Sequence, residues 1–185
     1  MSPFRYPGGK TWLIPLVRLW ICSQPRRPKE FVEPFAGGAS VSLTVAHENL
    51  ADHVTMTEID KEVAVVWLAI LGEHGTQLAD RISEFDLSPR SVDRILSRPS
   101  HKRIDKAFQA LLKNRVNHGG VMAKGAGRLN HGDGKGIGSR WYPDTLASRV
   151  RIIHGMRNRI TFKASDGFDL IRCEPTEHLR LTSVC

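Results

Sequence analysis

The sequence predicts an α/β fold in which a small parallel sheet is interrupted by an inserted helical region. Three observations lead to this prediction. Residues 30–71 alternate between extended and helical patterns, as the strand–helix units of a parallel sheet do. Residues 76–156 have helical spacing and a glycine-rich stretch, and an extended pattern returns at residues 159–164. A length of 185 residues suits one domain with a modest insertion.

The N-terminal elements follow from apolar spacing and from residues that start or stop a helix. Residues 10–21 are apolar with helical spacing, and Pro15 can bend or cap that helix. Residues 30–33 form a short extended run that stops at a proline. Ser40 can then cap a second helix that runs to about Leu50.

A second strand and a third helix follow. Residues 53–57 alternate between apolar and polar side chains and predict a strand that ends at Glu58. Asp60 can cap a helix over residues 61–74, whose central apolar run indicates burial. The order strand, turn, helix, strand, helix is how a parallel α/β sheet begins.

The middle of the chain is predicted to be helical. Capping residues and apolar spacing predict helices over residues 76–85, from Ser88-Pro89 onward, over residues 101–117 and over residues 143–156. Residues 119–138 contain eight glycines and predict a mobile loop or an irregular hairpin. A third strand over residues 159–164 leads into Ser165-Asp166-Gly167.

This pattern divides the chain into parts of different charge. Residues 1–70 and 157–172 would form the sheet part, residues 71–156 the insertion, and residues 173–185 an atypical tail. Residues 101–160 carry thirteen Lys and Arg residues and three acids, a net charge of +10, whereas the rest of the chain is slightly acidic. Such asymmetry favours a nucleic-acid partner, although a solvated basic face without a partner would look the same.

Composition excludes several classes of protein. No apolar run is long enough to span a membrane, and the N-terminus has no signal-peptide pattern, so we expect a cytoplasmic protein. The three cysteines have no metal-binding spacing and are expected to be free thiols. The eight histidines are scattered, so no metal site is predicted.

The turn between the first strand and the second helix is a candidate cofactor site. Residues 33–39 (Glu-Pro-Phe-Ala-Gly-Gly-Ala) lie where open α/β sheets bind cofactors, and glycines there allow close approach of the backbone. A plain strand–helix turn is the alternative. The run is not the G-x-G-x-x-G fingerprint, which disfavours NAD. Gly9-Lys10-Thr11 is not a phosphate loop either, because Phe4 stands where that motif needs glycine.

Two acids at strand ends are candidate cofactor ligands. Glu58 is placed to accept hydrogen bonds from the ribose hydroxyls of a nucleoside cofactor, or it is a solvent-facing acid. Asp60 competes for that role but is the better helix cap. Asp166 could reach an adenine amino group, or it could cap a helix over residues 167–172.

Cations surround the glycines of residues 118–140. Lys124, Arg128, Lys135 and Arg140 could neutralise phosphates or pair with guanine. A disordered basic loop with no partner is the alternative.

Two segments, taken together, resemble the cofactor half of Dam-type adenine-specific DNA methyltransferases. They are residues 3–10 (Pro-Phe-Arg-Tyr-Pro-Gly-Gly-Lys) and residues 31–40 (Phe-Val-Glu-Pro-Phe-Ala-Gly-Gly-Ala-Ser). The resemblance implies that S-adenosylmethionine is bound, with Glu58 at the ribose. It implies that the cofactor is bound by Tyr6, Lys10, Glu33, Phe35, Gly37 and Glu58. Asp166, at the end of the third strand, is a further candidate.

The resemblance continues into the basic region. Residues 114–120 (Asn-Arg-Val-Asn-His-Gly-Gly) resemble the family's asparagine–arginine signature, which implies that Arg115 and Asn117 contact DNA. Residues 71–156 would then be a target-recognition region inserted into a Rossmann-like methyltransferase sheet. The implied reaction transfers a methyl group from S-adenosylmethionine to the exocyclic amine of adenine in double-stranded DNA, after the base is flipped out.

The chain departs from the family at its end. The catalytic tetrapeptide Asp-Pro-Pro-Tyr is absent, so no catalytic residue is assigned. We expect a truncated enzyme with an incomplete sheet, no strand in residues 173–185 and an unpaired edge at the first strand. The alternatives are a non-catalytic DNA-binding remnant, or half of a split enzyme completed by a C-terminal half docked on that edge.

Overall fold

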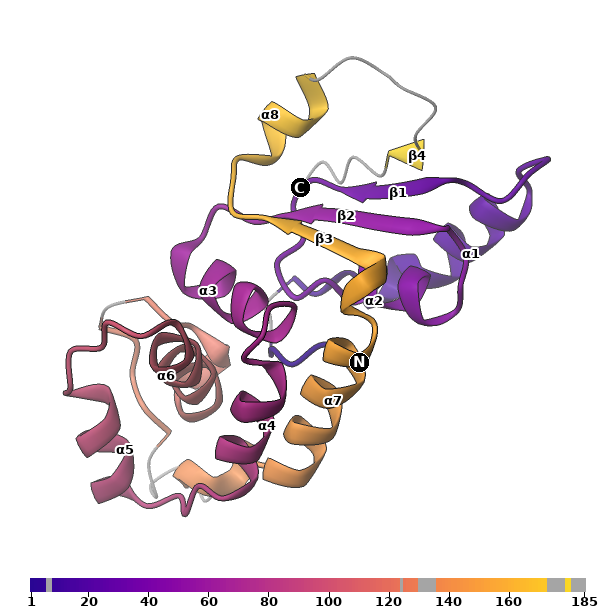
Figure 1. The fold of residues 1–185 in the computed structure, drawn as a ribbon. Helices are drawn as coiled ribbons and strands as arrows, with labels where there is room; N and C mark the ends of the chain where they lie inside the picture. Colours follow the sequence, from indigo (N-terminus) through magenta and orange to yellow (C-terminus); the bar gives the residue numbers. More distant parts are fainter. Residues whose placement is uncertain (6–7, 124, 130–135, 173–178, 181–185) are drawn as a thin grey trace.

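The protein is a mixed α/β structure built on a small parallel sheet. The computed structural model describes residues 1–5, 8–123, 125–129, 136–172 and 179–180. The strands are β1 (Glu30–Glu33), β2 (His53–Thr57), β3 (Ile160–Lys163) and β4 (Leu179–Arg180), in the order β3-β2-β1-β4 (Figure 1). All three pairings are parallel, which confirms the predicted α/β class with a small parallel sheet.

The first strand is not the unpaired edge that the sequence predicted. Phe31 and Val32 of β1 pair with Leu179 and Arg180 of β4. The C-terminal tail therefore contributes a short strand, although its sequence has no run of β-forming residues to reveal it. Backbone groups of β1 that would otherwise face solvent are satisfied by this pairing.

Helices of the N-terminal half cover the sheet. They are η1 (Lys10–Leu13), α1 (Ile14–Cys22), α2 (Ser40–His47) and α3 (Lys61–Ile70). Asp60 caps α3 as predicted, because its side chain accepts hydrogen bonds from the N–H groups of Glu62 and Val63. Two details differ: α3 ends at Ile70, and the residue before α2 is the left-handed Ala39, so Ser40 begins the helix and does not cap it.

The chain leaves the sheet after α3 and returns at β3. Between them lie α4 (Gly75–Ser83), α5 (Pro89–Leu96), α6 (Arg103–Val116), η2 (His118–Gly120), η4 (Ile137–Arg140), α7 (Pro143–Gly155) and η5 (Arg157–Arg159). Figure 1 shows α4 to α7 gathered on one side of the sheet, with α8 (Gly167–Arg172) at its far end. The helices predicted for the middle of the chain are thus confirmed, with bounds shifted by a few residues.

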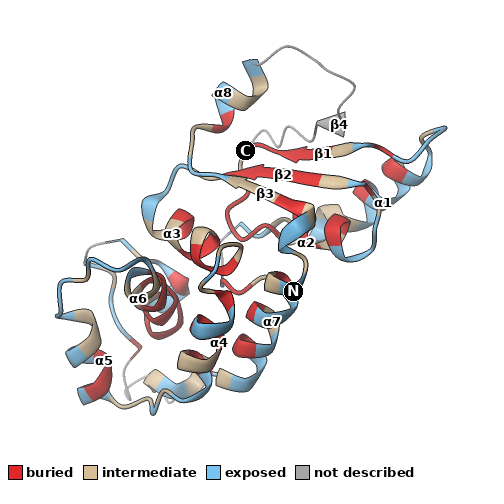
Figure 2. Cartoon of the chain, viewed as in Figure 1, coloured by how far each residue is buried: buried red, intermediate tan, exposed pale blue. Residues whose placement is uncertain are grey.

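One core joins the sheet to these helices. A single cluster of buried apolar side chains includes Met56 of β2, Trp67 of α3, Phe108 of α6 and Ile153 of α7 (Figure 2). Helix α3 packs against α6, and α4 packs against α7. Among the described residues, no helix is long and apolar enough to cross a bilayer.

The N-terminal segment is held inside this assembly. The Asn114 side chain accepts a hydrogen bond from Arg5 N (2.8 Å) and donates to Arg5 O (2.9 Å) and Gly120 O (2.8 Å). Arg115 donates to Pro3 O, and the Phe4 ring meets Trp67 edge-on at 5.6 Å. Side-chain hydrogen bonds therefore hold residues 1–5 against α6, and the ring contact holds them against α3.

Gly120 is required by this arrangement. Its φ is +80°, and a Cβ there would lie 2.4 Å from Arg5 O. We predict that Gly120→Ala destabilises the protein by the ~1–2 kcal/mol cost of the left-handed conformation plus ~1–3 kcal/mol for the clash. Gly125→Ala is the matched control, because Gly125 has φ +84° and no atom within 4 Å of the added Cβ. Urea unfolding of both variants measures the difference, and equal losses would contradict the steric argument.

Candidate functional site

The turn after β1 is fixed from several sides. Ala36 N donates to Thr57 O at 2.9 Å, which ties the turn to the end of β2. The buried Trp67 indole donates to Gly37 O at 2.9 Å. Gly37 and Ala39 both have φ +50°, so the backbone turns sharply between strand and helix. A backbone held in this way can present its N–H groups to a ligand without rearranging.

Glu58 lies beside this turn. Its Oε2 accepts from Gly37 N and its Oε1 accepts from Asp60 N, both at 2.9 Å. Each carboxylate oxygen can accept further hydrogen bonds. The half-buried carboxylate is thus oriented by two backbone donors and can receive two hydroxyls. Asp60 is engaged as the cap of α3.

Lys10 closes the turn from the N-terminal side. Its Nζ donates to Phe35 O at 2.5 Å and lies 3.6 Å from Glu33 Oε1. Because Lys10 follows Gly8 and Gly9 and begins η1, the N-terminal glycine segment is brought onto the β1–α2 turn. The two motifs that the sequence analysis paired are therefore in direct contact.

Glu33 is a buried acid with one unsatisfied oxygen. Its Oε2 accepts from Ser42 N (3.0 Å) and Ser42 Oγ (2.5 Å), whereas its Oε1 has no hydrogen bond among the described residues. Burial raises the pKa of Glu33, and the hydrogen bonds of Ser42 and the charge of Lys10 lower it by less. Lys10 Nζ is the cation that faces the otherwise unbonded Oε1 of Glu33, at 3.6 Å.

These groups border one cavity of about 290 Å³. Its lining includes the two glycine pairs 8–9 and 37–38, together with Lys10, Glu33, Phe35 and Glu58. Acidic, cationic and aromatic groups around exposed backbone suit a small nucleoside-like ligand. Across the described part of the chain, no three His, Cys, Asp or Glu residues are grouped as metal ligands.

Two other predicted cofactor residues are not placed at the cavity. Tyr6 lies outside the described residues. The Asp166 side chain accepts a hydrogen bond from Phe168 N at 3.0 Å, which is the helix-capping role, and it is not among the described residues that line the cavity. The following helix still touches the site, because Phe168 meets Phe35 edge-on with ring centroids 5.2 Å apart.

The predicted DNA-contacting residues have different surroundings. Arg115 and Asn117 are buried, and they bond to Pro3 O and Val121 O, so the structure gives them an internal role in place of contact with DNA. Burial lowers the pKa of Arg115 to about 10, with a smaller contribution from Arg149 and Arg5. Arg128 pairs with Asp93, and Arg140 is half-buried. Lys124 and Lys135 lie outside the described residues.

Sequence reasoning missed the role of Asn114. The Asn-Arg pair was interpreted as a signature for DNA, whereas Asn114 is 1% exposed and holds the backbone of Arg5. A polar residue in the apolar stripe of a long helix was the available signal, because a buried amide needs hydrogen-bond partners.

Comparison with protein families identifies a match for the first half of the chain. The family model for D12 class N6 adenine-specific DNA methyltransferases matches residues 6–106, more than half of the chain. The match includes the glycine turns, Lys10 and Glu58, and it continues through the helices to the start of α6. A search of curated proteins found no match.

The raised pKa of Glu33 makes stability depend on pH. Above the ordinary pKa of 4.5, the unfolded carboxyl ionises while the folded one keeps its proton, so rising pH destabilises the fold by about 1.4 kcal/mol per pH unit until the folded pKa is reached. We predict that Glu33→Gln matches the unmodified protein at pH 4 and becomes progressively more stable than it at higher pH. Thermal unfolding from pH 4 to 8 tests this, and parallel profiles would contradict it.

Proposed function

The chain belongs to the D12 class N6 adenine-specific DNA methyltransferase family, and we propose that its cavity beside Glu58 binds S-adenosylmethionine. The observation that carries this proposal is the Glu58 carboxylate, which Gly37 N and Asp60 N orient at a glycine-lined cavity. A carboxylate in this position can accept both hydroxyls of a ribose.

The remaining lining groups suit the rest of the cofactor. Lys10 carries the positive charge nearest to Glu33 and can attract the carboxylate of the methionine part. The aromatic ring of Phe35 can contact the cofactor, and it packs edge-on against the ring of Phe168. Tyr6 remains a predicted contact. Bound S-adenosylmethionine would supply an activated methyl group, and this chain would hold and orient it.

The sheet supports the same proposal. In the order β3-β2-β1-β4, the strands that follow β1 in the chain are placed first on one side of it (β2 and β3) and then on the other side (β4). The strand order therefore reverses between β1 and β4, although all strands remain parallel. Ligands of open α/β sheets bind at the carboxyl ends of strands next to such a reversal, and the cavity lies at the end of β1. We therefore infer a Rossmann-like sheet as the cofactor-binding part, formed by residues 1–70 and 157–172 together with β4 of the C-terminal tail.

The inserted helices are proposed as the target-recognition part. Residues 71–156 contain most of the net positive charge and the glycine-rich loop. An isolated antiparallel bridge between Asn117 and Arg128 closes the base of that loop, as in a hairpin. A basic surface provides affinity for the phosphates of duplex DNA.

Methyl transfer needs groups that these residues do not contain. The printed sequence has no Asp-Pro-Pro-Tyr, the family's tetrapeptide that orients the target amine. We propose that a segment with this motif must complete the site before adenine is methylated. A DNA-binding remnant without activity is the second candidate function, and the same missing motif favours it.

The cofactor assignment predicts a loss of affinity on changing Glu58. Glu58→Ala removes charged hydrogen bonds worth about 1.5–3 kcal/mol each, so we expect S-adenosylmethionine to bind at least ten-fold more weakly. Glu73→Ala is the control, because that carboxylate is 83% exposed and lies outside the cavity. Isothermal titration calorimetry provides both values, and unchanged affinity in Glu58→Ala would contradict the assignment.

The missing motif predicts inactivity that can be rescued. With methyl-labelled S-adenosylmethionine and duplex DNA, the 185-residue chain alone should incorporate no label. Addition of a polypeptide carrying Asp-Pro-Pro-Tyr from a family member should restore incorporation if the chain is a cofactor-binding half. Incorporation by the chain alone would overturn the proposed requirement, and no rescue despite DNA binding would favour the remnant.

A further inference from the structure

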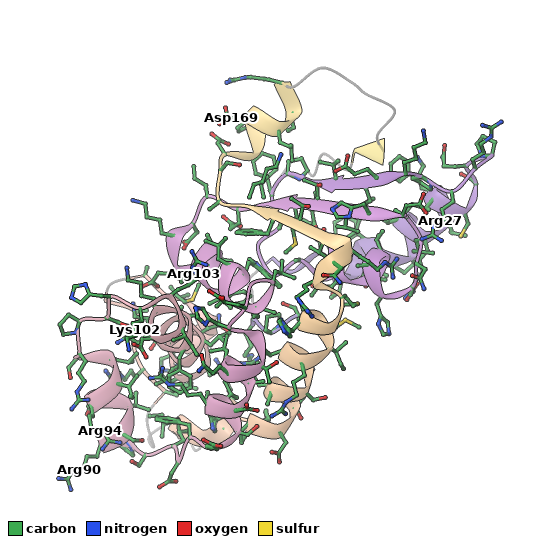
Figure 3. All side chains as sticks on the ribbon, in the orientation of Figure 1. Arg27, Arg90, Arg94, Lys102, Arg103 and Asp169 are labelled. Atoms are coloured by element: carbon green, nitrogen blue, oxygen red, sulfur yellow. The ribbon has the colours of Figure 1, made fainter. Side chains whose placement is uncertain are left out.

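A group of exposed cations lies on α5, on the turn after it and on the start of α6. The group comprises Arg90, Arg94, Arg98, Lys102, Arg103 and Lys106, all exposed, and we call it the α5–α6 basic face. Figure 3 labels Arg90 and Arg94 at the end of the helical part that is far from the sheet, and Lys102 and Arg103 nearer to α3. None of the six belongs to the site described above.

No ion pair among the described residues neutralises the charge of this face, although the exposed Glu73 borders the same surface hollow as Arg103 and Lys106. Segment 88–106 contains two acids, Asp93 and Asp105, and both are paired with arginines from elsewhere, Arg128 and Arg81. Within the described ranges, the side chains of the six cations make no ion pair or hydrogen bond with the protein. Six like charges thus lie close together in sequence without partners, an arrangement that self-repulsion disfavours in a free protein.

Helix stability accounts for only part of this group. Arg94 lies in the last turn of α5, where a cation suits the helix dipole. Lys102 and Arg103 instead stand at the start of α6, where cations oppose the dipole, α6 has no side-chain cap, and the acid of its first turn, Asp105, is paired with Arg81. An anionic partner would turn this unfavourable placement into a favourable one, because the free N–H groups and the cations would attract it together.

The face is held rigidly. Ser88 and Ser91 form a reciprocal capping box at the start of α5. The Gln109 amide of α6 donates to Ile95 O and Arg98 O, both at 2.8 Å, and so fixes the turn between the helices. The backbone of this face is therefore already ordered before any partner binds, and this lowers the entropic cost of binding.

The face is also continuous with the glycine-rich loop. Arg128, which pairs with Asp93 of α5, stands opposite Asn117 at the base of that loop. Cations on α5 and α6 thus flank the segment proposed to approach the bases. Phosphates repeat along a duplex at regular short intervals. A group of several cations therefore suits a duplex better than it suits a ligand with a single acidic group.

We propose that the α5–α6 basic face binds the phosphates of duplex DNA that flank the recognised site. The proposal rests on the DNA-binding part of the proposed function and adds the surface that provides the affinity. Phosphate contacts carry no sequence information, so the face sets affinity and orientation while the loop selects the base.

The test measures the salt dependence of binding to a fluorescent duplex of about 20 base pairs by anisotropy. Two variants remove charge from the face, Arg90→Gln with Arg94→Gln and Lys102→Gln with Lys106→Gln. Each lost phosphate contact should reduce the slope of log K against log salt by about 0.9, so each double variant should lose up to about 2. The loss should be equal on two duplexes of unrelated sequence.

The control is Arg26→Gln with Arg27→Gln, which removes two exposed charges from the loop before β1. Figure 3 labels Arg27 at the opposite end of the molecule from Arg90 and Arg94, and there it pairs with Asp52. The slope of this control should equal that of the unmodified protein. Face variants that coincide with the control would overturn the inference and leave DNA binding intact. An unmodified protein without salt-dependent binding would overturn both, and calorimetry with S-adenosylmethionine would still test the cofactor site separately.

Discussion

The side-chain amide of Asn114 is the contact that anchors the N-terminal segment to the helical part. It bonds to both backbone groups of Arg5 and also to Gly120 O, so it joins the N-terminal segment, α6 and the start of the glycine-rich loop. Gly8, Gly9 and Lys10, which come later in the same segment, line the cavity beside Glu58, where Lys10 donates to Phe35 O. The proposed cofactor cavity is therefore bordered by a segment that is also held by the helical part.

The cavity combines charges whose environments differ. Glu58 is half-buried, and each of its carboxylate oxygens accepts a hydrogen bond from a backbone N–H group. Glu33 is fully buried, and burial raises the pKa of its carboxyl group, while Ser42 and Lys10 lower it by less. Two carboxyl groups at one site thus have different surroundings, and Lys10 lies next to the buried one.

Local chemistry made much of the fold predictable. The strand over residues 53–57, the Asp60 cap and the glycine turn follow from patterns within a few residues, and the structure contains all three. Contacts between distant segments were not predictable in this way. Nothing near Asn114 in the sequence points to Arg5, and the pairing of β4 with β1 depends on two residues in a tail without strand-like composition. For the same reason, Arg115 was assigned to DNA from the asparagine–arginine signature, which does not reveal that its side chain is buried.

Gly167 joins two segments that lie far apart in the sequence. A Cβ at this position would lie 2.2 Å from Pro34 O, so the start of α8 packs directly on the β1–α2 turn. Any larger residue at this position would therefore press on the turn whose Gly37 N–H donates to Glu58. The backbone that orients Glu58 thus depends on a residue near the other end of the chain, which helps to hold the turn in place from outside the cavity.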